Sequence, residues 1–102
     1  MEGALSVFCR RSRKPFLVDS GADVSVFPAS TAQKSSKPLA ILSAANGSSI
    51  KTFGRKNISL VLPGLSVSHS FILADVQHPI LGTYFFRQNK LVIDINRRRL
   101  VR

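Results

Sequence analysis

Short apolar runs separated by turn residues make up most of the chain, and they predict many short strands. Asn46-Gly47 is the strongest hairpin signal that a short sequence can carry, and Pro63-Gly64 is a second turn. Residues 33–38 are polar and predict a surface loop, whereas residues 83–90 predict the one helix, about two turns long. We expect strands at residues 4–9, 15–18, 24–27, 39–45, 48–53, 57–62, 66–76, 91–95 and 99–101.

This pattern predicts an all-β domain, closed as a barrel or packed as a sandwich, with one short C-terminal helix. A length of 102 residues fits a single domain over residues 1–102, and the 44% apolar content is enough for a small core. No stretch approaches the roughly 18 consecutive apolar residues of a membrane span. We therefore expect no membrane partner.

Positive charge dominates the composition, with 15 basic residues against five acidic ones and a formal net charge of +10. Such a balance favours contact with polyanions, including RNA. No aromatic residues alternate with the arginines as stacking platforms would. We therefore interpret the basic residues as a solvated turn and tail that make at most weak, non-specific contact with nucleic acid. Eight of them form two clusters: Arg10, Arg11, Arg13 and Lys14, then Arg97, Arg98, Arg99 and Arg102.

Cysteine and histidine are scarce, which limits the chemistry available to the chain. Cys9 is the single cysteine, so no internal disulfide can form. Residues 1–9 lack the basic start and apolar run of a signal peptide, and we expect an intracellular location. His69 and His78 are interpreted as a surface strand residue and a loop residue. With one cysteine they make no metal site, and no cofactor is expected.

Asp19 is the carboxylate with the most distinctive surroundings. It follows the apolar run Phe16-Leu17-Val18 and precedes the small residues Ser20-Gly21-Ala22. A carboxylate at the end of a buried strand is expected to be half-buried, and Gly21 lets the backbone come close to a ligand. On its own, however, an Asp-Ser-Gly triplet is better explained as a strand-end Asp that caps a turn.

Two further motifs lie downstream of the triplet, and together the three resemble the retropepsins. These are the aspartic proteases of retroviruses and long-terminal-repeat retrotransposons, and those of gypsy-type elements are the most similar. The resemblance runs from about residue 4 to residue 102. It implies a β-rich homodimer in which two Asp-Ser-Gly loops meet at the two-fold axis. The matching segments are Phe16–Pro28, Ala44–Gly47 with Ile50–Gly54, and Ala74–Val76 with Pro79–Gly82.

The resemblance also implies roles for individual residues. Asp19 would be the catalytic residue, supported by its loop neighbours Gly21 and Ala22, and Ser20 would exchange hydrogen bonds with the partner chain. Residues 44–48 would form the tip of a flap hairpin over about residues 42–53, and Ile80-Leu81-Gly82 would pack behind the loop. The substrate-binding residues expected on this basis are Gly21, Asp23, Val24, Ala44, Ala45, Asn46, Gly47 and Leu81.

Peptide hydrolysis by this chemistry needs two carboxylates, and one Asp-Ser-Gly provides a single one. An ionised carboxylate takes a proton from the attacking water, and a protonated one supports the developing oxyanion. A two-fold dimer brings two copies of Asp19 together. We therefore expect a homodimeric aspartic endopeptidase that processes its own Gag-Pol-type polyprotein, in the cytoplasm or within virus-like particles. The alternatives are a retropepsin-like dimerisation or peptide-binding module with weak or no catalysis, and a basic RNA-associated domain.

Two positions depart from the retropepsin pattern. Tyr84 stands where gypsy-type sequences usually carry Asp or Asn, so the network at the helix start must differ. Thr83 stands where several retroviral relatives carry a basic residue that pairs with the acid matching Asp23. Asp23 is therefore expected to pair with another cation, such as an arginine of residues 10–13 from either chain.

The residue after the triplet predicts the pH range of activity. A hydroxyl at position 22 could donate a hydrogen bond toward the pair of carboxylates and favour their ionised form, whereas Ala22 cannot. We expect a mildly acidic optimum, and an Ala22→Ser variant should move the acidic limb of the pH–rate profile to lower pH. An acidic limb that stays in place in this variant would rule out the explanation.

Overall fold

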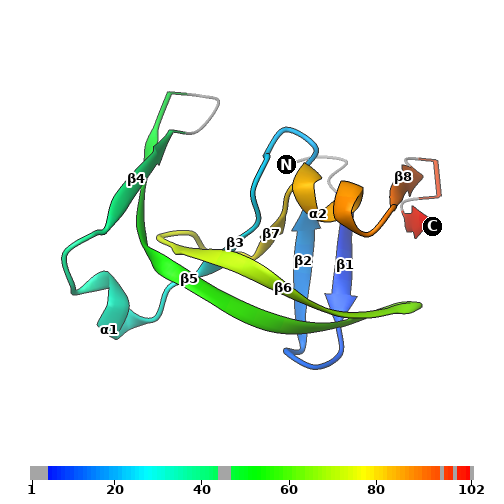
Figure 1. The fold of residues 1–102 in the computed structure, drawn as a ribbon, viewed down its shortest axis with the longest axis horizontal. Coiled ribbons are helices and arrows are strands. Elements are labelled where there is room, and N and C mark those ends of the chain that lie inside the picture. The colour runs from blue at the N-terminus through cyan, green and yellow to red at the C-terminus, as the bar shows by residue number, and fades with distance from the viewer. Residues whose placement is uncertain (1–4, 44–46, 95, 98, 102) are drawn as a thin grey trace.

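The computed structural model describes residues 5–43, 47–94, 96–97 and 99–101, and strands predominate in them (Figure 1). The strands are β1 (Leu5–Cys9), β2 (Lys14–Val18), β3 (Val26–Pro28), β4 (Ala40–Ser43), β5 (Ser49–Leu62), β6 (Leu65–Ala74), β7 (Ile80–Leu81), β8 (Val92–Asp94) and β9 (Arg99–Val101). The helices are α1 (Thr31–Lys34) and α2 (Thr83–Gln88), and neither is long enough to cross a bilayer. The prediction of a β-rich domain with a short C-terminal helix is confirmed.

Seven strands form one sheet in the order β1-β2-β7-β3-β6-β5-β4, and β8 and β9 form a separate two-stranded sheet. The β2–β7 and β3–β6 pairs are parallel, and the other pairs are antiparallel. The end of β1 approaches β5, where Arg10 N donates to the Val61 carbonyl (2.9 Å) and Val61 N donates to Cys9 Sγ (3.4 Å). The strands β1 and β4 nevertheless remain the sheet edges, so the closed barrel, one of the two arrangements that we predicted, is not found in the described residues.

The short helix α1 begins just before the segment that we predicted to be a loop. Ser30 Oγ accepts a hydrogen bond from Gln33 N (3.1 Å), and Gln33 Oε1 accepts one from Ser30 N (2.7 Å). This reciprocal pair is a capping box, and its Ser-x-x-Gln signature is present in the sequence. The prediction of a single helix is therefore wrong, because the capping box stabilises a helical turn in a polar segment that buries no apolar face.

The long strand β5 replaces the two strands predicted at residues 48–53 and 57–62. Its first part pairs with β4 and its remainder with β6, and the register to β6 shifts between Thr52 and Arg55. Gly54 lies within this irregularity at a φ of 111°, which glycine adopts without steric penalty. One strand thus continues from the hairpin arm into the main sheet. The two-residue strand β7 was not predicted at all.

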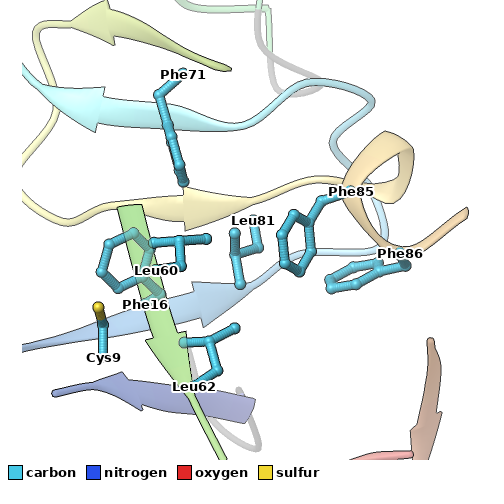
Figure 2. Close-up of a cluster of buried hydrophobic side chains, with 8 residues drawn as sticks. All are labelled: Cys9, Phe16, Leu60, Leu62, Phe71, Leu81, Phe85 and Phe86. Atoms are coloured by element: carbon cyan, nitrogen blue, oxygen red, sulfur yellow. The ribbon is translucent and has the colours of Figure 1, made fainter. Parts of the chain in front are cut away.

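The hydrophobic core joins the main sheet to α2 (Figure 2). Phe16 of β2 and Phe71 of β6 pack edge to face with ring centroids 5.7 Å apart, and both are fully buried. Phe71, Phe85 and Phe86 all lie in this core. Because Phe16 lies three residues before Asp19, the core holds the strand that leads to the candidate site. The buried cluster contains Cys9, Phe16, Leu60, Leu62, Phe71, Leu81, Phe85 and Phe86.

His69 is buried, with 7% of its surface exposed, so its interpretation as a surface histidine is wrong. Alternation along β6 places it on the same face as Phe71, which points into the core. Its ring centroid lies 5.3 Å from that of Phe71 and 4.9 Å from that of Phe85. Burial lowers the pKa of His69 below its ordinary value, because the charged ring would lose its hydration. His78 is exposed in a loop, as predicted.

Acid should destabilise the fold through His69. A histidine whose pKa is lower in the folded than in the unfolded state stabilises the fold fully above the unfolded value of about 6.5. That contribution is lost as the pH falls toward the folded-state pKa, at up to about 1.4 kcal/mol per pH unit. Urea unfolding at about pH 7.5 and about pH 5 should show a smaller pH effect in His69→Leu than in the parent. The exposed-site variant His78→Gln should behave like the parent, and an undiminished effect in His69→Leu would assign the titration to other groups.

Candidate active site

The loop after β2 carries Asp19, the candidate catalytic residue. Its side chain is half-buried, as predicted, and its Oδ1 accepts a hydrogen bond from Gly21 N at 2.9 Å. The Asp19 carbonyl accepts a second hydrogen bond from Ala22 N at 3.2 Å, which closes a tight turn. A Cβ at position 21 would lie only 3.2 Å from Oδ1, so glycine leaves the room that this carboxylate orientation requires. The hydrogen bond from Gly21 N holds Oδ1 within the turn and thereby fixes the orientation of the whole carboxylate, including Oδ2.

Backbone hydrogen bonds connect this loop to β7 and to the start of α2. Asp19 N donates to the Leu81 carbonyl (3.0 Å). Thr83 N donates to the Ala22 carbonyl (2.8 Å), and Tyr84 N donates to the Asp23 carbonyl (3.1 Å). The first amides of a helix have no partner inside the helix, so the loop carbonyls satisfy two of them. Backbone groups therefore link the helix start to the loop at the two positions that depart from the retropepsin pattern.

Gly82 packs directly against the backbone of the loop. A Cβ there would come within 2.5 Å of the Val24 carbonyl oxygen and 2.8 Å of the Asp23 carbonyl oxygen. The Gly82 amide donates to Ser25 Oγ at 3.0 Å, and Ser25 is 3% exposed. Ser25 was missed in the sequence, although a serine between Val24 and Val26 in an apolar run signals a buried polar group that needs a partner.

The outer face of the loop is open to solvent. Ser20, Gly21 and Asp23 are exposed, and the Ser20 hydroxyl has no hydrogen-bond partner among the described residues. The arginine expected to pair with Asp23 within the chain is not found in the described part either. The turn at residues 10–13 lies at the other end of β2, and a five-residue strand separates it from the loop.

The two arms of the predicted flap hairpin pair as β4 and β5, from Ala40↔Thr52 to Ser43↔Ser49. Thr52 Oγ1 donates to the Ala40 carbonyl at 3.0 Å and fastens the base of the arm. In Figure 1 the arm extends toward the same side as the loop after β2. Gly47 is exposed with a φ of 87°, the left-handed conformation that Asn-Gly turns use. Ala44, Ala45 and Asn46 lie outside the described residues.

Leu81 and Val24, both expected to line a substrate cleft, have very different surroundings. Leu81 is fully buried because β7 lies between β2 and β3, so its side chain supports the loop from behind and does not line a cleft of this chain. Val24 is 37% exposed and borders a hollow of about 490 Å³ together with Arg55 and Tyr84. Across the described residues, His, Cys, Asp and Glu side chains form no group of three or more that could hold a metal ion.

Two solved structures share this arrangement of strands. The retroviral protease-like domain of Ddi1 from Leishmania major matches with a TM-score of 0.67 and 19% identity, over 96% of this chain and 85% of that domain. EIAV protease complexed with the inhibitor HBY-793 matches with a TM-score of 0.61 and 21% identity, over 85% of this chain and 86% of that one. The chain has a retropepsin fold. No protein-family model and no curated protein sequence matches it.

Replacing Gly82 with alanine should separate α2 from the loop of this retropepsin fold. The added methyl group would overlap the loop carbonyls, at a cost of about 1–3 kcal/mol in the free energy of unfolding. The amides of Thr83 and Tyr84 should then lose protection from hydrogen exchange.

Gly64→Ala is the matched control, because a Cβ at Gly64 meets nothing within 4 Å although its φ is 73°. This variant should be strained without selective loss of protection at Thr83 and Tyr84. Equal protection of the two amides in both variants would contradict the role assigned to Gly82.

Proposed function

We propose that the chain is an aspartic endopeptidase in which Asp19 supplies a catalytic carboxylate. The observation that carries the proposal is the position of Asp19 at the end of a core strand in a retropepsin fold. The hydrogen bond from Gly21 fixes the carboxylate, and the bonds to β7 and α2 hold its loop. The two solved structures are about one-fifth identical to the chain, so the proposal depends on the loop and its motif.

Catalysis of this kind requires a second carboxylate, which we propose comes from Asp19 of an identical chain. An isologous two-fold contact places the same loop of both chains face to face. The exposed Ser20 supports this arrangement, because its hydroxyl is free of partners in the described part of the chain. Two carboxylates a few ångströms apart do not both ionise easily, so they share one proton and titrate as a pair.

In the proposed reaction, the ionised carboxylate removes a proton from water as the water attacks the scissile carbonyl carbon. The protonated carboxylate donates a hydrogen bond to the carbonyl oxygen as negative charge develops there. The tetrahedral intermediate then breaks its C–N bond, and a proton passes to the leaving amine. Gly21 and Asp23, both exposed beside Asp19, are proposed to bind the substrate backbone.

We propose that the substrate is an extended segment of a polyprotein, that of a gypsy-type element. An extended peptide offers its main-chain groups to a neighbouring strand, and the β4–β5 arm reaches the side of the molecule that carries the loop (Figure 1). The exposed surface of Val24 favours an apolar side chain near the scissile bond.

Asp19→Asn should reduce cleavage of an unbiased peptide mixture at mildly acidic pH by at least about a hundredfold, because an amide cannot act as the base. Asp75→Asn is the matched control, since Asp75 is an exposed carboxylate that follows β6. It should retain the parental activity. Equal cleavage by the parent and Asp19→Asn would sink the proposal.

A mixing experiment tests the shared site. If chains pair at random, half of the parental chains in an equimolar mixture with Asp19→Asn have a mutant partner, so the activity per parental chain should fall to about half. Activity that does not fall on mixing would mean that each chain works alone. Parental dimers that bind peptides but cleave none would favour the alternative of a peptide-binding module.

A further inference from the structure

The β1–β2 hairpin turns at the end of β2 that is remote from Asp19 (Figure 1). Four exposed cations lie in and just after this turn, and a fifth lines the same hollow as one of them. Four belong to the turn and the start of β2, and the fifth comes from β5. The hydrogen bond from Arg10 N to the Val61 carbonyl holds the turn against β5. The length of β2 separates the turn from Asp19 by roughly 17 Å. We call these residues the basic turn surface: Arg10, Arg11, Arg13, Lys14 and Lys56.

A hollow of about 410 Å³ is lined by Arg11 and Lys56 of this surface. Its walls carry two cations and three neutral hydrogen-bonding side chains, and they carry no carboxylate. Phe27 also lines it, half-buried, with its ring packed near Phe16 and Phe71 at centroid distances of 6.0 and 6.1 Å. The fold thus adds an aromatic ring that the linear sequence does not place among the arginines. The polar lining residues are Arg11, Ser12, Lys56, Asn57 and Ser59.

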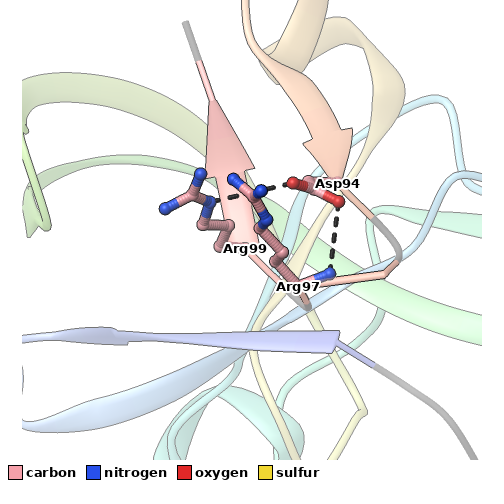
Figure 3. Close-up of polar contacts among 3 residues, drawn as sticks. All are labelled: Asp94, Arg97 and Arg99. Atoms are coloured by element: carbon pink, nitrogen blue, oxygen red, sulfur yellow. Dashed lines mark hydrogen bonds and ion pairs between the residues drawn. The ribbon is translucent and has the colours of Figure 1, made fainter.

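The second basic cluster has different surroundings (Figure 3). Asp94 is half-buried. Its Oδ1 accepts a hydrogen bond from Arg97 N (3.2 Å), and its Oδ2 lies 3.8 Å from Arg99 Nε. Within the described residues no such carboxylate approaches the basic turn surface. The positive charge of that surface is therefore not compensated by a paired carboxylate of the described residues.

The backbone of the turn is unfavourable for the residues it carries. Arg13 has a φ of 59°, a left-handed conformation that costs a residue with a Cβ about 1 kcal/mol and that glycine adopts freely. Arg13 N donates to the Cys9 carbonyl at 2.8 Å, so this conformation closes the turn. Four like charges within five residues also repel one another. A turn selected for stability alone would carry glycine at position 13 and fewer cations. We therefore interpret the arginines and the lysine of this turn as binding residues.

We propose that the basic turn surface binds the phosphate backbone of single-stranded nucleic acid, with a base stacked in the hollow against Phe27. When unpaired arginines and lysines neutralise phosphates, the counterions condensed on the nucleic acid are released, which favours binding. An aromatic ring offers a base a flat apolar face for stacking. A single strand is favoured over a duplex because its unpaired bases can reach an aromatic ring. The exposed neutral side chains of Asn57 and Ser59 suit phosphate and sugar oxygens. Binding at this surface is separate from the proposed catalytic loop.

The probe is a fluorescein-labelled 12-nucleotide oligouridine RNA, and the readout is its anisotropy with the full chain across a range of salt concentrations. If five phosphates are neutralised, log K should fall against log[salt] with a slope of about −3.5. Arg11→Gln/Lys56→Gln should make the slope shallower by about 1.4. The matched control Lys34→Gln/Lys37→Gln removes two exposed lysines outside this surface and should leave the slope unchanged.

Arg13→Gly separates binding from folding. It removes a charge and the unfavourable φ together, so it should raise the urea midpoint while making the salt slope shallower by about 0.7. If Lys34→Gln/Lys37→Gln made the salt slope as shallow as Arg11→Gln/Lys56→Gln does, the effect would be one of general charge and the proposal would be overturned. An oligoglutamate of equal charge that competes as well as the RNA would overturn it in favour of an acidic polypeptide.

Discussion

The backbone of residues 81–84 lies directly against the backbone of residues 19–25, with no room for a side chain between them. This contact constrains most of the structure around the candidate site. It requires glycine at position 82 and a buried hydroxyl at position 25. It also requires that α2 begin where the loop carbonyls can accept hydrogen bonds from its first amides. The geometry of Asp19 therefore depends on residues about sixty positions away in the sequence.

Much of this arrangement could be predicted from local pattern. Apolar runs ended by Asn-Gly, Pro-Gly and basic turns located most strands, because a turn leaves a strong signature in a few adjacent residues. Half-burial of Asp19 followed from its place at the end of Phe16-Leu17-Val18. The candidate loop itself was found through its motif and its spacing from Pro79–Gly82.

What the sequence did not predict depends on distant partners. Strand β7 is two residues long and pairs with β2 and β3, so it has no periodicity of its own. His69 looked like a polar position on a strand, yet the face it shares with Phe71 is covered by α2. The sequence could not predict that the sheet stays open either, since whether its edge strands β1 and β4 pair depends on the twist accumulated over seven strands. Helix α1 is different, because its capping box is a local signal, Ser-x-x-Gln, in the sequence.

The one thiol of the chain lies where the end of β1 meets β5, fully buried and in contact with the Val61 amide. A reagent cannot reach Cys9 Sγ until that junction separates, so its rate of alkylation measures how often the hairpin leaves the sheet. The same junction holds the basic turn in place. Alkylation of this single thiol would therefore report the separation of β1 from β5, which would also release the basic turn from the sheet.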